Sequence, residues 1–208
     1  MIIRTPMATE GILQVFAKAP VPGRVKTRLI NYLGEQRATE LHQQLVQQCL
    51  QKFSHLFSVQ LWCAPNEFHP FFQNCQTEFG VSLHRQIGVD LGQRMAYALA
   101  SAAPTSAVLI GSDCPSLDAP IIREAFLALQ QKNAVVLAPA EDGGYVLIGM
   151  QRAIPELFQE IPWGTSQVFT LTRSRLHDLG LRWKELPTQW DIDRAEDFER
   201  WQQQRRNK

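Results

Sequence analysis

The sequence predicts an α/β fold in which a mostly parallel sheet is covered on both faces by helices. Two observations carry this prediction. Short, unbroken apolar runs such as 107–111 and 134–138 are typical of strands that are buried on both faces. These runs alternate with longer segments of helical periodicity, as expected for connections between parallel strands.

The apolar runs predict strands over 12–18, 58–63, 81–85, 107–111, 134–138, 145–150 and 181–186. The segments between and after them predict helices over 35–57, 67–79, 90–103, 118–132, 154–159, 165–179 and 194–205. In the helix at 35–57, apolar residues recur every three or four positions, and the outer face is rich in glutamine. Asp90 with Gln93 forms a capping box, and Asp118 can cap the helix that follows it. The last helix has acids in its first turn and arginines in its last, as the helix dipole favours.

Length and composition limit the class of protein. The 208 residues are 45% hydrophobic and carry a net charge of +1, so we expect one folded domain over residues 10–203, with flexible ends at 1–9 and 204–208. The near-zero charge disfavours a nucleic-acid partner bound through bulk charge. No apolar stretch is long enough to span a membrane, and the start does not read as a secretory signal. The four cysteines form no C-x-x-C pair, which fits free thiols in the cytoplasm.

The first candidate site follows the first strand. Between Gly11 and Gly34 there is no acidic residue, but there are four cations, and the loop also contains Pro22 and Gly23. The cations are Lys18, Arg24, Lys26 and Arg28. Guanidinium and ammonium groups suit a polyphosphate, and the glycine permits close approach of the backbone. The loop matches neither a Walker A nor a G-x-G-x-x-G pattern, and a solvated basic loop is the simpler explanation.

The second candidate is Asp113, which comes directly after the strand at 107–111. Ligands of parallel sheets bind beyond the carboxyl ends of the strands, so this carboxylate is expected to face the site. Magnesium binds one or two carboxylates together with substrate phosphates, so Asp113 is a candidate metal anchor. The simpler alternative is that Asp113 organises a turn before Pro115.

Two further segments contain candidate carboxylates. In the segment 141–145, Asp142 could be a metal ligand, a base or a hydroxyl acceptor, although an ordinary Asp-Gly turn explains it equally well. Near the last helix, alternation puts Asp191 and Asp193 on one side of an extended segment, where they could converge on a cation. Asp193 could also form a capping box with Glu196, and both roles can hold at once, since a cap needs only one carboxylate oxygen.

Other candidates are less specific. Asp90, Gly92 and Arg94 could contact substrate, although capping explains Asp90. Thr165 is expected to cap a helix, and the five histidines, which lack metal-ligand spacing, are expected mostly on solvated faces.

Taken together, these residues resemble the radical-SAM/selenodomain-associated transferase family, which is labelled glycosyltransferase-like and belongs with the nucleotide-diphospho-sugar transferases of GT-A fold. The resemblance runs in order from about residue 12 to 200. It rests on the segments 16–29, 86–95, 111–115, 139–149, 161–163 and 191–197.

The resemblance implies a Rossmann-like three-layer α/β/α sandwich that binds a nucleotide with Mg²⁺ or Mn²⁺. The basic loop then resembles the phosphate-binding loop of related guanylyltransferases, and Asp113 and Asp193 match metal-binding aspartates. Arg194-Ala195 replaces the usual Thr-Pro after Asp193, and Trp163-Gly-Thr replaces Trp-Ser-Thr. The resemblance also implies substrate contacts from Gly143, Gly144, Tyr145 and Trp163.

Three functions remain open. In the first, a nucleotide sugar donates its sugar to a small acceptor, and Asp142 orients or deprotonates the acceptor hydroxyl. In the second, a substrate phosphate attacks a nucleoside triphosphate, and Lys26 and Arg24 offset the negative charge of the phosphates. The sequence Asp-Cys-Pro at 113–115, in place of a D-x-D, favours this second hypothesis. In the third, the chain binds a nucleotide without turnover. All three use the basic loop and Asp113, and the oligomeric state stays open.

Overall fold

The computed structural model describes residues 11–206, and its core is a seven-stranded sheet with the order β3-β2-β1-β4-β6-β5-β7. The strands are β1 Ile12–Lys18, β2 Ser58–Ala64, β3 Ser82–Arg85, β4 Ala107–Gly111, β5 Val135–Pro139, β6 Tyr145–Met150 and β7 Trp183–Glu185. Only β6 among them runs antiparallel to its neighbours. The predicted α/β class with a mostly parallel sheet is confirmed.

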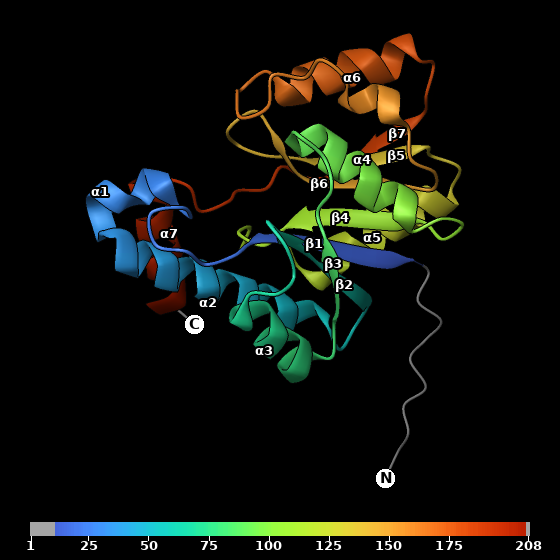
Figure 1. Ribbon diagram of the computed structural model, residues 1–208. Helices are drawn as coiled ribbons and strands as arrows, with labels where there is room; N and C mark the ends of the chain where they lie inside the picture. The colour runs from blue at the N-terminus through green and yellow to red at the C-terminus, as the bar shows by residue number, and fades with distance from the viewer. Residues whose placement is uncertain (1–10, 207–208) are drawn as a thin grey trace.

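Helices cover both faces of the sheet (Figure 1). They are α1 Ile30–Leu33, α2 Glu35–Phe53, α3 Pro70–Phe79, α4 Leu91–Ser101, α5 Ala119–Gln130, α6 Val168–Asp178 and α7 Ala195–Arg206, with short 3₁₀ helices η1 Thr27–Leu29 and η2 Pro155–Phe158. Helices α2, α3 and α5 share one apolar cluster with the sheet, and α4, α6 and η2 share the other. The three layers of a Rossmann-like sandwich are therefore present.

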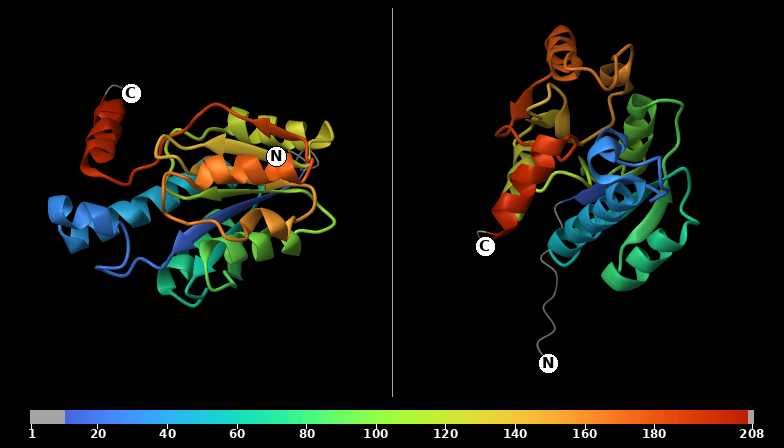
Figure 2. Two further views of the ribbon diagram at one scale, coloured as in Figure 1. Left: turned by 90° about the horizontal axis from the view of Figure 1, so that it is seen from above. Right: turned by 90° about the vertical axis from the view of Figure 1, so that its left-hand side faces the viewer.

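A third, smaller cluster joins α2 to the last helix. Leu41 and Leu45 of α2 pack with Trp190 and Trp201, which places α7 beside α1 and α2 rather than on the sheet (Figures 1 and 2). This packing brings the segment before α7 to the edge of the sheet where β1 and β4 end.

The described residues include part of one predicted flexible end. Residues 204–206, expected in a flexible end, are the last residues of α7, whereas the predicted flexibility of 1–9 and 207–208 lies outside the described residues. Within the described part, no helix is long and apolar enough to cross a membrane.

Candidate active site at the carboxyl edge of the sheet

Four segments that are distant in the sequence meet at one edge of the sheet. The basic loop follows β1, and residues 112–117 follow β4. Because β6 is antiparallel, the turn at 140–144 before it lies at this same edge. Residues 189–193 join them, since Ala140 bridges to Gln189 and Ile192 N donates to Asp113 O at 3.0 Å. The candidate segments of the sequence analysis therefore share one region.

A cleft of about 660 Å³ opens between the basic loop and Asp113. This volume lies within the range of about 300–1,000 Å³ that is typical of ligand sites. Its charged lining residues are Lys18, Arg24, Lys26, Arg28, Arg94, Asp90, Asp113 and Asp193. Lys18 and Arg24 form no ion pair with another described residue. The cleft therefore brings two cations without an ion-pair partner among the described residues close to carboxylates of the kind that bind a metal.

Lys26 connects the basic loop to the end of β4. Its Nζ donates to Asp113 Oδ2 at 2.6 Å and to the carbonyl oxygen of Ile192, and its side chain is only 5% exposed. Its backbone is left-handed, with φ 47°, a conformation that costs a non-glycine residue roughly 1–2 kcal/mol. These two hydrogen bonds hold Lys26 in this strained conformation.

The ion pair with Lys26 determines the charge of Asp113. Burial by itself would raise the pKa of this carboxyl, but the charge of Lys26 and its hydrogen bond outweigh burial and lower the pKa below its ordinary value. Asp113 is therefore an anion at neutral pH, the state needed to bind a divalent cation.

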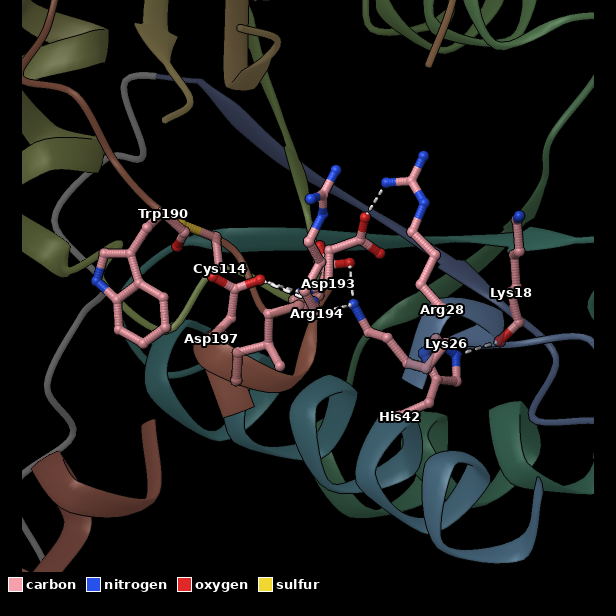
Figure 3. Close-up of polar contacts among 11 residues, drawn as sticks. Lys18, Lys26, Arg28, His42, Cys114, Trp190, Asp193, Arg194 and Asp197 are labelled. Carbon is pink, nitrogen blue, oxygen red and sulfur yellow. Dashed lines mark hydrogen bonds and ion pairs between the residues drawn. The ribbon is translucent and has the colours of Figure 1, made fainter. Parts of the chain in front are cut away.

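A second loop cation pairs with a second predicted metal ligand. Arg28 forms an ion pair with Asp193, as Figure 3 shows. The predicted capping by Glu196 is wrong, because Asp197 accepts hydrogen bonds from the backbone N–H groups of Asp193 and Arg194. Since Asp197 provides the cap, the carboxylate of Asp193 is left to face the cleft.

His42 lines the cleft and is buried, an exception to the expectation that the histidines lie mostly on solvated faces. It is 6% exposed and its Nε2 lies 2.8 Å from the carbonyl oxygen of Lys18 (Figure 3). Burial is the main cause that lowers its pKa, so the imidazole is neutral and Nε2 donates. Its position, four residues after Ala38 and three before Leu45, already falls on the apolar stripe of α2.

Asp191 is a further carboxyl group near Asp113. Both carboxylates line a smaller cavity bordered by β6 and α4. Burial is the largest cause that raises the pKa of Asp191 to about 7, and the negative charges of Asp113 and Asp142 raise it further. The expected convergence of Asp191 and Asp193 is therefore only partial, because they line different cavities.

The raised pKa of Asp191 predicts a pH-dependent stability. In the unfolded chain the pKa of this carboxyl is near 3.8. Its favourable contribution to the free energy of unfolding is therefore complete below pH 3.8 and is lost as the pH rises towards 7. In EDTA, Asp191→Asn should therefore be more stable than the natural protein at pH 8 by about 1–3 kcal/mol, with a smaller difference at pH 5. Urea unfolding at both pH values measures this.

The matched control is Glu78→Gln, which neutralises an exposed carboxylate on α3. It should change the free energy of unfolding little and equally at the two pH values. An equal effect of Asp191→Asn at pH 5 and pH 8 would contradict the assignment of the raised pKa.

The remaining loop residues are placed as follows. Asp90 caps α4 by accepting from Gln93 N at 2.7 Å, and Arg94 Nε donates to Gly88 O at 3.0 Å; both line the cleft. Pro22 and Gly23 are not among the lining residues. Gly23 has φ +78° and lies against Glu35, so it shapes the basic loop where the chain turns back to α2.

The predicted substrate residues near β6 are largely used in packing. Trp163 lies so close to Gly92 that a Cβ there would come within 2.6 Å of its ring, and it packs edge-on against Tyr145. Of these three, only Tyr145 lines a cavity, the smaller one. Thr165, expected as a cap, stands before α6, which begins at Val168.

Asp142 is exposed and accepts a hydrogen bond from Gly144 N at 2.9 Å. Gly143 has φ +90° and packs against the backbone of Ser166, where a Cβ would lie 2.3 Å from the carbonyl oxygen. The Asp-Gly turn is thus present, and Asp142 lies close enough to raise the pKa of Asp191.

The donor set fits a divalent cation that is held partly by substrate. Carboxylate oxygens are the ligands that Mg²⁺ and Mn²⁺ prefer, and Asp113 and Asp193 both line the cleft. Within residues 11–206, no group of three or more side chains is arranged to hold an ion by itself. We therefore expect one or two carboxylates and the phosphate oxygens of a ligand to complete the coordination.

Solved structures with this fold include transferases. A protein from Desulfovibrio desulfuricans G20, provisionally described as a nucleotide-diphospho-sugar transferase, is 31% identical, with 91% of this chain and 85% of that chain covered at a TM-score of 0.82. A nucleotidyl transferase from Methanothermobacter thermautotroptrophicus is 16% identical, with 93% and 97% covered at a TM-score of 0.61. Glucosyl-3-phosphoglycerate synthase from Mycobacterium tuberculosis, solved with Mn²⁺ and UDP, is 12% identical, with 91% and 75% covered at a TM-score of 0.52.

The chain has the α/β fold of nucleotide-diphospho-sugar transferases and belongs with the transferases. The model of DUF2064, described as "Uncharacterized protein conserved in bacteria", matches residues 39–165, and the chain belongs to this family. No curated protein matches the sequence significantly.

Proposed function

We propose that this chain is a divalent-metal-dependent transferase that takes a sugar from a nucleotide sugar and passes it to a small-molecule acceptor. The observation that carries the proposal is the single cleft in which the basic loop faces Asp113 and Asp193. Cations on one wall suit a diphosphate, and carboxylates on the other suit the metal that bridges it. Similarity to the Desulfovibrio desulfuricans protein supports a nucleotide-sugar donor.

The cations and the carboxylates of the cleft have different roles in this reaction. Lys18 and Arg24 bind the phosphates, while Lys26 and Arg28 pass from their carboxylate partners to phosphate oxygens as the ligand enters. A bound divalent cation would stabilise the negative charge of the leaving diphosphate. Asp113 and Asp193 would hold that cation, while Asp90 and Arg94 line the cleft wall from α4.

Nucleotidyl transfer is the second candidate, and one observation favours it. Asp113 is followed by Cys114-Pro115 rather than by a second carboxylate, so the D-x-D arrangement of many glycosyltransferases is lacking at this strand end. In that case a substrate phosphate would attack a nucleoside triphosphate held in the same cleft. A nucleotide-binding protein without turnover is the third reading.

Three further expectations belong to the proposal. The partners are a nucleotide sugar or nucleoside triphosphate and a small acceptor, not a nucleic acid, since the net charge is +1. The four cysteines are buried free thiols, which supports the cytoplasm as location. The association with radical-SAM proteins rests on the sequence motifs alone.

A panel of nucleotides and nucleotide sugars tests the proposal. With Mn²⁺, the matching nucleotide sugar should raise the melting temperature and release nucleoside diphosphate slowly. Arg24→Gln should weaken its binding about tenfold, because one charge-assisted contact to phosphate is lost. Calorimetric titration of both proteins measures this loss.

Arg37→Gln serves as the matched control, since Arg37 is exposed on α2 outside the cleft. It should bind nucleotide as the natural protein does. Pyrophosphate release from a nucleoside triphosphate would instead indicate nucleotidyl transfer, and binding without turnover would indicate the third reading. Equal losses from Arg24→Gln and Arg37→Gln would contradict the placement of the phosphates.

A further inference from the structure

A second cavity, of about 150 Å³, adjoins the cleft at Asp113. The two spaces share Phe16, Leu91, Gly111 and Asp113 as lining residues. The basic loop that follows β1 lines only the larger cleft, and β6 lines only the smaller cavity. A molecule in the cavity would therefore lie next to the carboxylate at which a metal-bound diphosphate is expected.

The walls of this cavity are apolar except at one end. Met95 of α4 and Leu109 and Ile148 of the sheet are each at most 4% exposed and contribute to the walls. The charged lining residues are Asp113 and Asp191 alone, and no described Lys, Arg or His lines the space.

We propose that this cavity binds the acceptor, and that the acceptor is an uncharged alcohol with a small apolar body, not a phosphate or a carboxylate. This inference rests on the proposed function and narrows its substrate class. An anionic acceptor would find no Lys, Arg or His among the described lining residues to pair with, and removing an unpaired charge from water is strongly unfavourable. A hydroxyl group can donate to a carboxylate while its carbon chain contacts the apolar walls.

The volume limits the part of the acceptor that enters. A cavity of about 150 Å³ corresponds to roughly five water molecules by their share of liquid volume, and so to about five non-hydrogen atoms. In the reaction, the hydroxyl oxygen forms a bond to the anomeric carbon of the donor. The bond from that carbon to the diphosphate breaks, the diphosphate leaves with the electron pair, and the hydroxyl proton passes to solvent.

Two probes of similar size and different charge test this assignment. 1,2-Propanediol and lactate have the same carbon chain, but only lactate carries a carboxylate. With Mn²⁺ and the nucleotide sugar that stabilises the protein, propanediol should speed diphosphate release about tenfold and appear as a glycoside in mass spectra. Lactate should do neither. Equal or greater acceleration by lactate, or acceleration by neither probe of a protein that hydrolyses the donor, would overturn the inference.

A variant that fills the small cavity tests whether propanediol binds there. Val146 is partly buried on β6 and lines the small cavity but not the cleft. Val146→Phe should abolish the propanediol effect and preserve both the nucleotide-induced thermal shift and the slow hydrolysis of the donor. Leu127→Phe, at an exposed position on α5, is the control and should keep the propanediol effect.

The outcomes separate the two proposals. If no nucleotide or nucleotide sugar binds, the proposed function fails. If donor binding and hydrolysis are present and propanediol still accelerates release in a folded Val146→Phe variant, the proposed function stands and the cavity assignment fails. If Val146→Phe does not fold, we measure binding of both probes to the natural protein by saturation-transfer NMR, with Mn²⁺ and nucleoside diphosphate present. Propanediol should bind. Preferential binding of lactate would overturn the inference.

Discussion

Replacing Lys26 with methionine should destabilise the free protein by about 2 kcal/mol and should nearly abolish nucleotide binding. The variant leaves the Asp113 carboxylate and the Ile192 carbonyl oxygen without their shared donor. Loss of one partner from a buried ion pair costs about 3–5 kcal/mol, and the lower value follows because the Asp113 side chain is 36% exposed and partly solvated. Urea unfolding in EDTA measures the stability, and calorimetric titration measures nucleotide affinity.

Although Lys26→Met is less stable on its own, it should gain more stability from a divalent cation than the natural protein does. Lys26 occupies Asp113 in the free protein, so a divalent cation must displace its ammonium group before it binds. Without nucleotide, Mn²⁺ should therefore stabilise Lys26→Met more than the natural protein. Since Lys26 also lowers the pKa of Asp113, the loss of stability as pH falls through that pKa should be smaller in the variant.

A double-mutant cycle checks the origin of the effect. Asp113→Asn removes the anion, so Lys26→Met introduced into that background should cost less than it does alone. Equal costs in the two backgrounds would show that Lys26 acts through its hydrogen bond to Ile192 O or through packing of its carbon chain, and not through the ion pair with Asp113.

The strands that border the site could be predicted closely from the sequence. Strands β1, β4 and β6 begin and end at the predicted residues, because each is an apolar run bounded by polar or glycine-containing segments. Their burial follows from composition, but the direction of β6 does not. The turn at 140–144 is too short for a crossover helix, and this length was the available signal for an antiparallel strand.

Helix ends were less predictable, because apolar spacing continues into turns. Helix α2 was predicted to reach residue 57 and ends at Phe53. Phe57 keeps the helical spacing because it packs on Phe53 and Phe126 from the turn that follows. The short helices η1 and α1 were not predicted, since each is too short to show a helical period in the sequence.

The candidate site, too, could be predicted from the sequence only in part. The position of a residue at a strand end places Asp113 and the basic loop at one edge, as the sequence predicts. It does not reveal that Lys26 and Arg28 pair with the carboxylates, because those contacts join residues 87 and 165 positions apart. Nor does it reveal that Asp191 and Asp193 line different cavities, which depends on where residues 189–193 cross the edge.

Replacing Asp113 with asparagine should remove the metal-dependent part of nucleotide binding and lower turnover by about 10²–10³-fold. Asparagine keeps the shape of the side chain but loses the negative charge that a divalent cation needs. Nucleotide alone should still bind, because Lys18, Arg24 and Lys26 remain, and Lys26 is no longer paired with an anion. Thermal shifts with nucleotide, with and without Mn²⁺, and steady-state rates measure the two effects.

Asp193→Asn provides the matched comparison on the other predicted ligand. Its partner Arg28 is 53% exposed, so this ion pair is more solvated than that of Asp113, and loss of the carboxylate should cost less stability. If both aspartates bind the metal, each variant should lower Mn²⁺ affinity in the presence of nucleotide. The loss should be larger for Asp113→Asn, because Asp113 is anchored at the end of β4 through the Ile192–Asp113 backbone hydrogen bond. An unchanged Mn²⁺-dependent shift in Asp113→Asn would exclude this residue as the metal anchor, and an unchanged shift in Asp193→Asn alone would leave Asp113 with phosphate oxygens as the whole of the metal site.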